Sequence, residues 1–280
     1  MALFTKIAFA SVFLLIIANI ASAAYIVVTE PVNNKIDEGQ TIDLGVVGPG
    51  QKLEITTGRS SGVFDFRGVE ELWDRIKVEE KTLPAGWSKV DSLFYEGKPR
   101  AFAIVSSDAP DGDYILDFTG ERDYGELSNA PMHFKGKVKV SKNVFEFSVL
   151  NKNVESGIEQ PATFMLKLKN TGSASDVFEI SVVSGLPKGW GFKKTVLVPY
   201  NSEKEVPYEI SPSEQAEFSI KLKAVSLSSD KISREQQVTL VAKSSLFQDA
   251  KAASKGVILF PTIEQVVYNL IGFISANLFN

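Results

Sequence analysis

Cysteine is absent from this chain of 280 residues, and histidine occurs once, as His133. Without thiols the chain has no disulfide framework, iron–sulfur cluster, thiolate nucleophile or thiolate-bound zinc. A single histidine excludes multi-histidine metal sites and leaves one candidate base for a Ser-His-Asp arrangement. These shortages favour a protein that is not an enzyme, and we expect no cofactor and no bound metal.

An excess of positive charge is lacking as well. Thirty basic residues stand against 34 acidic ones, which gives a net charge of -4. Proteins that hold nucleic acid through its phosphates carry clustered basic residues, so no nucleic-acid partner is expected. The hydrophobic content of 44% and charged content of 23% describe a globular chain with room for one large or two ordinary domains.

The first 23 residues have the pattern of a secretory signal peptide. Lys6 provides the charged flank, residues 7–20 are apolar, and Ala21-Ser22-Ala23 supplies small residues for cleavage. The alternative is an uncleaved N-terminal anchor, because the apolar run is long and residues 25–28 continue it. In both cases the chain is expected to leave the cytoplasm.

Short runs of alternating polar and apolar residues follow, separated by Gly, Pro, Asn and Asp. This pattern predicts β-strands with one buried face, and turns about every ten residues predict β-sandwiches. The strands expected in the first half are 52–56, 102–105, 114–118 and 137–140. Those expected in the second half are 145–149, 164–168, 178–182, 218–222 and 238–242. The predicted fold class is therefore all-β.

A pentapeptide repeats within the chain. Leu83-Pro84-Ala85-Gly86-Trp87 recurs as Leu186-Pro187-Lys188-Gly189-Trp190, and the displacement is close to the length of one sandwich domain. We therefore predict two tandem modules, residues 24–140 and 141–245. Proline and glycine shape a turn that lets the flanking leucine and tryptophan reach one apolar layer. Leu83, Trp87, Leu186 and Trp190 are accordingly predicted core residues, with a sugar-stacking role for the tryptophans as the alternative.

The second half also resembles a known family. The motif Phe164-x-Leu166-x-Leu168-x-Asn170-Thr171-Gly172, followed by 176–182 and then by Gly185-Leu186-Pro187-x-Gly189-Trp190, is similar to the Ig-like module found beside bacterial glycosidases and repeated in archaeal cell-surface proteins. Ser107-Asp108-Ala109-Pro110-x-Gly112-x-Tyr114 resembles the end of that module. Ser211-Pro212-Ser213-Glu214 departs from the usual Ala-Pro-x-Gly turn. The resemblance implies an antiparallel Ig-like sandwich used as a spacer, adhesion or surface-coat unit.

The third tryptophan, Trp73, lies outside the repeat. Val69, Leu72, Trp73 and Ile76 are spaced as in an amphipathic helix, but comparison with the second module favours a strand over 74–78 preceded by an irregular insertion. Trp73 is therefore a candidate ligand contact. Aromatic loop residues offer the same chemistry for a carbohydrate; they are Phe64, Phe66, Tyr95 and Tyr124.

Acidic residues gather in two places, and each was weighed as a calcium site. The first group is Asp108, Asp111 and Asp113, and the second is Glu70, Glu71 and Asp74. Neither has the spacing of the twelve-residue calcium loop, and Asp-Gly turns need no metal. His133 follows Pro131 and Met132 and is expected to enter a strand rather than act as a base, since no G-x-S-x-G context accompanies it.

Charge is scarce again at the C-terminal end, where Glu264 is the only charged residue between Val257 and Phe279. We predict a linker over 246–256 and a hydrophobic helix over 257–280. The helix positions expected to face a membrane are Ile263, Val266, Val267, Leu270, Ile271 and Ile274. The length suffices for a bilayer, which needs about 20 residues. Lysines on the external flank alone oppose the usual orientation bias, so an interfacial helix and a helix packed on the second module stay open.

These patterns together predict a non-enzymatic exported protein of the cell envelope, with its domains outside the cytoplasm and its C-terminal helix at the membrane. Its Ig-like modules are expected to act as structural, spacer or adhesion elements. A carbohydrate-binding module of the cell surface is the alternative. The expected partners are the membrane and either envelope proteins or surface glycans.

Overall fold

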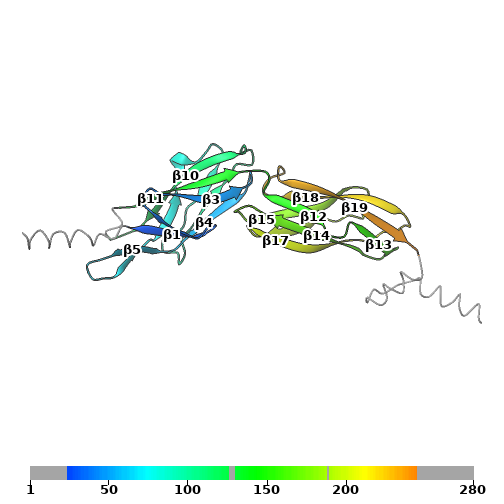
Figure 1. Ribbon diagram of the computed structural model, residues 1–280, viewed down its shortest axis with the longest axis horizontal. Helices are drawn as coiled ribbons and strands as arrows, with labels where there is room; N and C mark the ends of the chain where they lie inside the picture. The colour runs from blue at the N-terminus through cyan, green and yellow to red at the C-terminus, as the bar shows by residue number, and fades with distance from the viewer. Residues whose placement is uncertain (1–23, 126–129, 188, 245–280) are drawn as a thin grey trace, which may run out of the picture. The chain divides into compact units, whose positions relative to one another are not determined.

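The computed structural model describes residues 24–125, 130–187 and 189–244, which form two compact units (Figure 1). The first unit contains residues 24–144 with the short segments 171–176 and 199–201, and the second contains the other described residues. The main segment of the first unit therefore ends at residue 144, four residues after the predicted boundary at residue 140. The predicted signal segment, most of the linker and the predicted hydrophobic helix lie outside the described residues.

The first unit is built from two sheets and a hairpin. One sheet has the order β2-β1-β4-β9-β8, the other has the order β3-β11-β10-β7, and β5 pairs only with β6. Strand β3 runs parallel to β11, and the remaining pairs are antiparallel. The elements are β1 (Tyr25–Glu30), β2 (Asn34–Asp37), β3 (Thr41–Val47), β4 (Lys52–Thr57), β5 (Ser60–Phe64), β6 (Glu70–Leu72), β7 (Arg75–Val78), the 3-10 turn η1 (Glu80–Thr82), β8 (Ser88–Val90), β9 (Arg100–Ile104), β10 (Gly112–Glu121) and β11 (Met132–Val140).

Strand β11 shows how the sequence fixes the two faces of a sheet. Its residues alternate strictly between buried and exposed, with Met132 and Phe134 facing inward and His133 and Lys135 facing outward. Residue 136 also faces inward, and it is a glycine because a Cβ at this position would lie only 2.5 Å from a methyl carbon of Leu44. The core between the two sheets is therefore closed by the apolar half of each alternating strand.

The second unit has the same construction without the hairpin. Its sheets have the orders β12-β14-β17 and β13-β19-β18-β15-β16, and β13 runs parallel to β19. The strands are β12 (Phe145–Val149), β13 (Asn153–Gly157), β14 (Ala162–Asn170), β15 (Asp176–Ser184), β16 (Lys194–Val198), β17 (Ser202–Ile210), β18 (Glu217–Ser226) and β19 (Ser233–Lys243). Phe145 and Phe178 stack across its core with ring centroids 3.7 Å apart.

The two units repeat one strand order. The row β3-β11-β10-β7 corresponds to β13-β19-β18-β15, and β1-β4-β9 corresponds to β12-β14-β17. In both units a short strand lies parallel to the last strand, and the first strand pairs in the opposite sheet. This is the arrangement of an Ig-like sandwich. The first unit has additional strands, because neither β2, which pairs with β1, nor the β5–β6 hairpin has a counterpart in the second unit. The short strands β8 and β16 also differ, since β8 joins β9 whereas β16 joins the sheet of β15.

The repeated pentapeptide forms the same turn in both units. The backbone N–H of Trp87 donates to the carbonyl of Pro84 at 3.1 Å, and that of Trp190 donates to Pro187 at 3.4 Å. The glycine before each tryptophan has a positive φ, +79° at Gly86 and +95° at Gly189. A turn of this kind needs the left-handed conformation at its third position, which glycine adopts without a steric cost.

Each of the nine strands predicted from alternation coincides with an observed strand. The strand 145–149 matches β12 at both ends, and the others differ from the observed strands at one or both ends. The segment before β7 differs from the expectation. The insertion is an ordered hairpin, β5–β6, instead of an irregular stretch, and the helical spacing of Val69, Leu72 and Trp73 forms no helix. Among the described residues, no helix is long and apolar enough to cross a membrane.

Candidate functional site

A row of polar side chains crosses the outer face of the β7–β10–β11 sheet. Strand register creates this row: Arg75 lies opposite Glu121, Lys77 lies opposite Thr119, and Thr119 lies opposite His133. The apolar neighbours of these residues point to the other face and fill the core. We call the row, together with Glu79 at the end of β7, the polar row.

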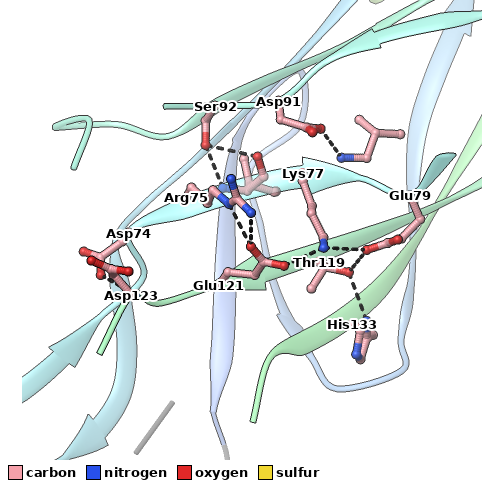
Figure 2. Close-up of polar contacts among 12 residues, drawn as sticks. Asp74, Arg75, Lys77, Glu79, Asp91, Ser92, Thr119, Glu121, Asp123 and His133 are labelled. Atoms are coloured by element: carbon pink, nitrogen blue, oxygen red, sulfur yellow. Dashed lines mark hydrogen bonds and ion pairs between the residues drawn. The ribbon is translucent and has the colours of Figure 1, made fainter. Parts of the chain in front are cut away.

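Charges alternate along the polar row, as Figure 2 shows. Nε of Arg75 donates to the Glu121 carboxylate at 2.7 Å. Nζ of Lys77 lies 2.5 Å from the other oxygen of Glu121 and 3.5 Å from the Glu79 carboxylate. Lys77 and Glu121 are thus each held between two groups of opposite charge, which compensates for their partial burial.

These contacts also shift the pKa values of three groups in the row, Lys77, Glu79 and Glu121. The hydrogen bond to Glu121 raises the pKa of Lys77 despite burial. Burial opposes ionisation of Glu121, but hydrogen bonds from Lys77 and Arg75 outweigh it and lower the pKa of that carboxyl. The hydrogen bond from Thr119 lowers the pKa of Glu79. A general acid or base works best with a pKa near the operating pH, and these shifts move the three groups away from it.

Glu79, Thr119 and His133 form a line of hydrogen bonds. The Thr119 hydroxyl donates to Glu79 at 2.5 Å and lies 3.0 Å from Nδ1 of His133. A hydroxyl carries one hydrogen, so Nδ1 of His133 must be the donor to Thr119. This order places the buried hydroxyl between acid and imidazole, whereas a nucleophilic triad places the imidazole in the middle. The structure therefore gives His133 an outward, hydrogen-bonded position on β11, in agreement with its expected entry into a strand.

A pocket of about 320 Å³ adjoins this line of hydrogen bonds. It is lined by Gly39, Glu79, Lys81, Thr82, Asp117, His133, Phe134 and Lys135. Both signs of charge occur in its wall, and no one chemical class of ligand matches the set. Within the described part of the chain, no group of three His, Cys, Asp or Glu residues is placed to hold a metal ion.

The free edge of β7 is covered by side chains from the segment that follows β8. The Ser92 hydroxyl accepts from the backbone N–H of Ile76 at 2.7 Å and donates to the carbonyl of Ile76 at 3.0 Å. Asp91 accepts from the N–H of Val78 at 2.9 Å. These side chains take the place of a neighbouring strand, so this edge has few groups left to pair with another chain.

The structure corrects the assignment of Trp73 as a candidate ligand contact. Trp73 is 1% exposed, and its indole Nε1 donates to the carbonyl of Tyr25 at 2.8 Å. A side chain so enclosed offers no face to a sugar. It is buried because β6 brings it over the core, where a Cβ on Gly120 would lie 3.5 Å from its ring.

The tryptophans and leucines of the repeat are buried to different extents in the two units. Trp87 is 9% exposed and contacts the ring of Tyr114, with centroids 5.2 Å apart, and Leu83 packs partly buried against the same core. Trp190 and Leu186 are half-buried, and Trp190 meets Phe218 edge to face at 5.3 Å. The repeat therefore places each indole against an aromatic residue of a later strand, Tyr114 on β10 or Phe218 on β18.

The structure separates the residues of the second acidic group, and each is held by different donors. Glu70 accepts from the Ser60 hydroxyl at 2.5 Å and from the N–H of Gly62, and these hydrogen bonds lower its pKa. Glu71 lies 3.1 Å from Arg122, and Asp74 lies 2.7 Å from Arg59. In the first group, Asp113 pairs with Lys137 at 3.1 Å.

Exposed aromatic side chains lie on the hairpin and on nearby loops. Phe64 and Phe66 are 58% and 94% exposed, and Tyr95 and Tyr124 are 54% and 64% exposed. The Tyr95 hydroxyl donates to Asp123 at 2.5 Å, which raises the pKa of Tyr95 to about 12. The four aromatic loop residues selected from the sequence are thus accessible, unlike Trp73.

Four residues of the polar row were not predicted as site residues from the sequence; they are Lys77, Glu79, Thr119 and Glu121. One signal was available, because Arg75, Lys77 and Glu79 recur at every second position between apolar residues, which marks the outer face of a strand. Their partners on β10 follow only from the register, and the sequence alone does not determine that register.

Comparisons with known proteins found no matching family profile and no matching curated protein. Among solved structures, the chain is similar to a chimeric titin Z1Z2 carrying a decorin peptide, at 10% identity, with 80% of this chain and 100% of that chain covered and a TM-score of 0.35. Fibronectin(III)-like modules of CbhA from Clostridium thermocellum match at 12% identity, with 78% of this chain and 94% of that chain covered and a TM-score of 0.25. A PapD-like domain of human CEP192 matches at 13% identity, with 36% of this chain and 85% of that chain covered and a TM-score of 0.25.

These neighbours carry immunoglobulin-, fibronectin(III)- and PapD-like domains. The fold assignment itself rests on the strand order of each unit, which defines an Ig-like β-sandwich.

Proposed function

We propose that this chain is an exported, non-enzymatic protein of the cell envelope whose two Ig-like sandwiches act as structural, spacer or adhesion modules. The observation that carries the proposal is the repetition of one strand order, with the same pentapeptide turn in each unit. The apolar residues 7–20 support export, and the charge-poor C-terminal segment supports attachment to a membrane. The surface-coat and spacer roles implied by the sequence resemblance are consistent with this use.

Contact with partners is assigned to loops more than to sheet edges. The β7 edge is covered by Ser92 and Asp91, as described above. The outer strand β17 carries Pro207 and the exposed charges Glu203, Lys204 and Glu205. Proline and charge are common devices that keep an edge strand from pairing with another chain. These two edges are therefore poor surfaces for pairing, and the proposal assigns adhesion to the loops.

Detergent-phase partition tests the membrane part of this proposal. The full chain should enter the detergent phase, and a version ending at Lys255 that lacks the N-terminal 23 residues should stay in the aqueous phase. A third version that keeps the N-terminal segment and ends at Lys255 shows which end is responsible. If all three stay in the aqueous phase, the membrane attachment proposed here is wrong.

A carbohydrate-binding surface is the second candidate, favoured by the exposure of Tyr95 and Tyr124. Aromatic rings with an accessible face and nearby hydrogen-bonding groups are suited to stack on sugars. Pull-down on insoluble polysaccharides should then retain the chain, and Tyr124→Ala should release it while Ile115→Ala, at an exposed site on β10, should not. Retention that survives both changes would count against this surface.

A further inference from the structure

The tip of the β5–β6 hairpin holds an aromatic side chain in solvent on a well-ordered turn. Phe64 pairs with Glu70, and the three residues 66–68 form the loop. Gly68 has a φ of +78°, and its N–H donates to the carbonyl of Asp65 at 2.9 Å. This is a three-residue hairpin loop with glycine in the left-handed position. Phe66 at its apex is 94% exposed.

The polar groups of the tip are satisfied within the tip itself. One oxygen of Asp65 accepts from the N–H groups of Arg67 and Val69 at 2.8 and 2.9 Å. The other oxygen accepts from Nε and a terminal nitrogen of Arg67 at 2.9 and 2.8 Å. The charge of Arg67 is therefore compensated locally. The Arg67 side chain stays 67% exposed, and its guanidinium lies over the Phe66 ring at 5.5 Å from the centroid. The exposed apolar side chains beside it are Phe64, Phe66 and Val69, which we call the hairpin tip.

This chemistry favours an apolar partner over a glycan. A sugar-binding platform needs hydrogen-bonding side chains beside the aromatic face, and at the hairpin tip Asp65 and Arg67 already bind each other. Phe66 also presents no hydroxyl or indole N–H of its own. A rigid loop that displays apolar side chains loses little conformational freedom when an apolar phase receives them.

The base of the hairpin identifies the apolar phase. The Tyr25 hydroxyl lies 3.0 Å from the Ser60 hydroxyl, and a Cβ on Gly62 would lie 2.2 Å from the Tyr25 ring. Tyr25 begins β1, and the apolar run of residues 7–20 ends only a few residues before it. The exposed Lys35 places its ammonium 3.8 Å from the centroid of the Tyr25 ring, beside the same end of the unit. Figure 1 shows the hairpin projecting from the end of the first unit at which β1 begins.

We propose that the hairpin tip is a lipid contact: with residues 7–20 retained as an N-terminal anchor, Phe66 and its neighbours Phe64 and Val69 enter the interface of the bilayer. The anchor brings the membrane surface to Tyr25, and the hairpin, joined to Tyr25 at its base, then meets the same surface. Apolar side chains of interfacial segments reach about 5–10 Å into the headgroup boundary. The inference rests on export, which is part of the proposed function, and it does not need the C-terminal segment.

The absence of native cysteine gives a direct test on the full chain. Phe66→Cys is labelled with an environment-sensitive fluorophore, and the chain is reconstituted into vesicles of phosphatidylcholine and phosphatidylglycerol. The matched control is Ile115→Cys, at a 55% exposed site on β10. We expect a blue-shifted emission at position 66 that is quenched by nitroxide lipids carrying the spin label near the headgroup, and neither effect at position 115.

Three results would overturn the inference, and each has a different meaning. Vesicles that float with the chain while the emission at position 66 stays that of water show that the tip does not touch lipid. A chain that does not float shows that the anchor is missing. Equal quenching at positions 66 and 115 shows adsorption without a specific contact. Flotation alone reports on the attachment in the proposed function, so failure of that proposal is separated from failure of the hairpin tip.

Phe66→Ser provides a second measurement that does not depend on the label. The Phe66 side chain is 94% exposed, and its ring contact is with the exposed guanidinium of Arg67, so the thermal unfolding of this variant should match that of the unchanged chain closely. Quenching of a fluorophore at Val69→Cys should fall when Phe66→Ser is added, because the apex no longer enters the lipid. Unchanged quenching in the double variant would contradict the assignment of Phe66 as the inserted residue.

Discussion

Trp73 links the first strand of the chain to the inserted hairpin. Its indole is buried, and its N–H satisfies the carbonyl of Tyr25, the residue at which β1 begins. Arg59 donates to the carbonyl of Trp73 at 3.0 Å and pairs with Asp74, so both sides of this tryptophan are held. A residue with this many contacts contributes to stability and not to ligand binding.

We predict that Trp73→Ala lowers the free energy of unfolding by about 3–5 kcal/mol, because truncation of a buried tryptophan leaves a cavity. Trp73→Phe should cost less, since it keeps most of the packing and loses the hydrogen bond to Tyr25. Chemical denaturation measures both values. Phe66→Ala is the matched control at an exposed aromatic site and should change stability by no more than about 0.5 kcal/mol. A loss at position 73 as small as this control would contradict the burial.

The polar row predicts a dependence of stability on pH. The folded-state pKa of Glu121 is lowered, so its contribution is present above the pKa of the unfolded chain and is lost as the pH falls through the folded value. Glu121→Gln should therefore reduce the free energy of unfolding by about 1–2 kcal/mol at neutral pH. The difference from the unchanged chain should shrink below about pH 4, near the ordinary pKa of glutamate. Denaturation curves across this range test the claim, and a difference independent of pH would contradict it.

At the scale of elements, the pentapeptide turns explain why the repeat is visible in the sequence. Each turn needs a glycine with positive φ, and each places a tryptophan against the ring of a residue on a later strand, Tyr114 on β10 or Phe218 on β18. Backbone conformation and packing thus restrict the same five residues. The long strands need only alternating apolar residues, which many sequences provide.

Substitution of the turn glycines should be costly in both units. Gly86→Ala and Gly189→Ala each place a side chain in the left-handed region, which costs about 1–2 kcal/mol. At Gly189 a Cβ meets no atom within 4 Å, whereas at Gly86 it would lie 3.0 Å from the Ser106 hydroxyl, so Gly86→Ala should be the more destabilising. Gly97→Ala is the control, because Gly97 has no positive φ and open space around it. Denaturation in urea ranks the three variants, and a loss at Gly97 equal to the others would contradict the role of φ.

Alternation predicted nine of the 19 strands in the described residues, and it did not find others such as β3 and β17. It also failed where another pattern competed with it. The apolar residues in 69–76 have a helical spacing, yet this segment forms strand β6 and the start of strand β7. The turn signal Asp65-Phe66-Arg67-Gly68 was present, and it specifies the hairpin through the Asp65 hydrogen bonds and the φ of Gly68. Turn chemistry was the better guide in this segment.

The site residues were harder to predict than the strands. The order of tryptophan burial is opposite to the one expected, since Trp73 is deeply buried and Trp190 is half-buried. A repeat marks residues that a turn requires, and it does not report how far the neighbouring loops cover them. Likewise, the pairing of Lys77 with Glu121 depends on the register of β7 against β10, which tertiary packing sets.

At the scale of the whole molecule, two copies of one sandwich suggest a chain that presents surface. The charged groups of the polar row are paired with one another, and loops and the hairpin tip carry the exposed aromatic residues. The apolar segments predicted at both ends of the chain agree with a position at a membrane. These features support the proposal that the protein works by position and contact.

Export is the central claim, and the lack of native cysteine allows it to be measured directly. Ile115→Cys in the first unit and Leu197→Cys in the second, 55% and 53% exposed, are expressed in the full chain in a bacterial host. Protoplasts are then treated with a membrane-impermeant maleimide. We predict that intact protoplasts label both positions to the same extent as lysed ones. Labelling that requires lysis would place the sandwiches inside the cell and contradict the account.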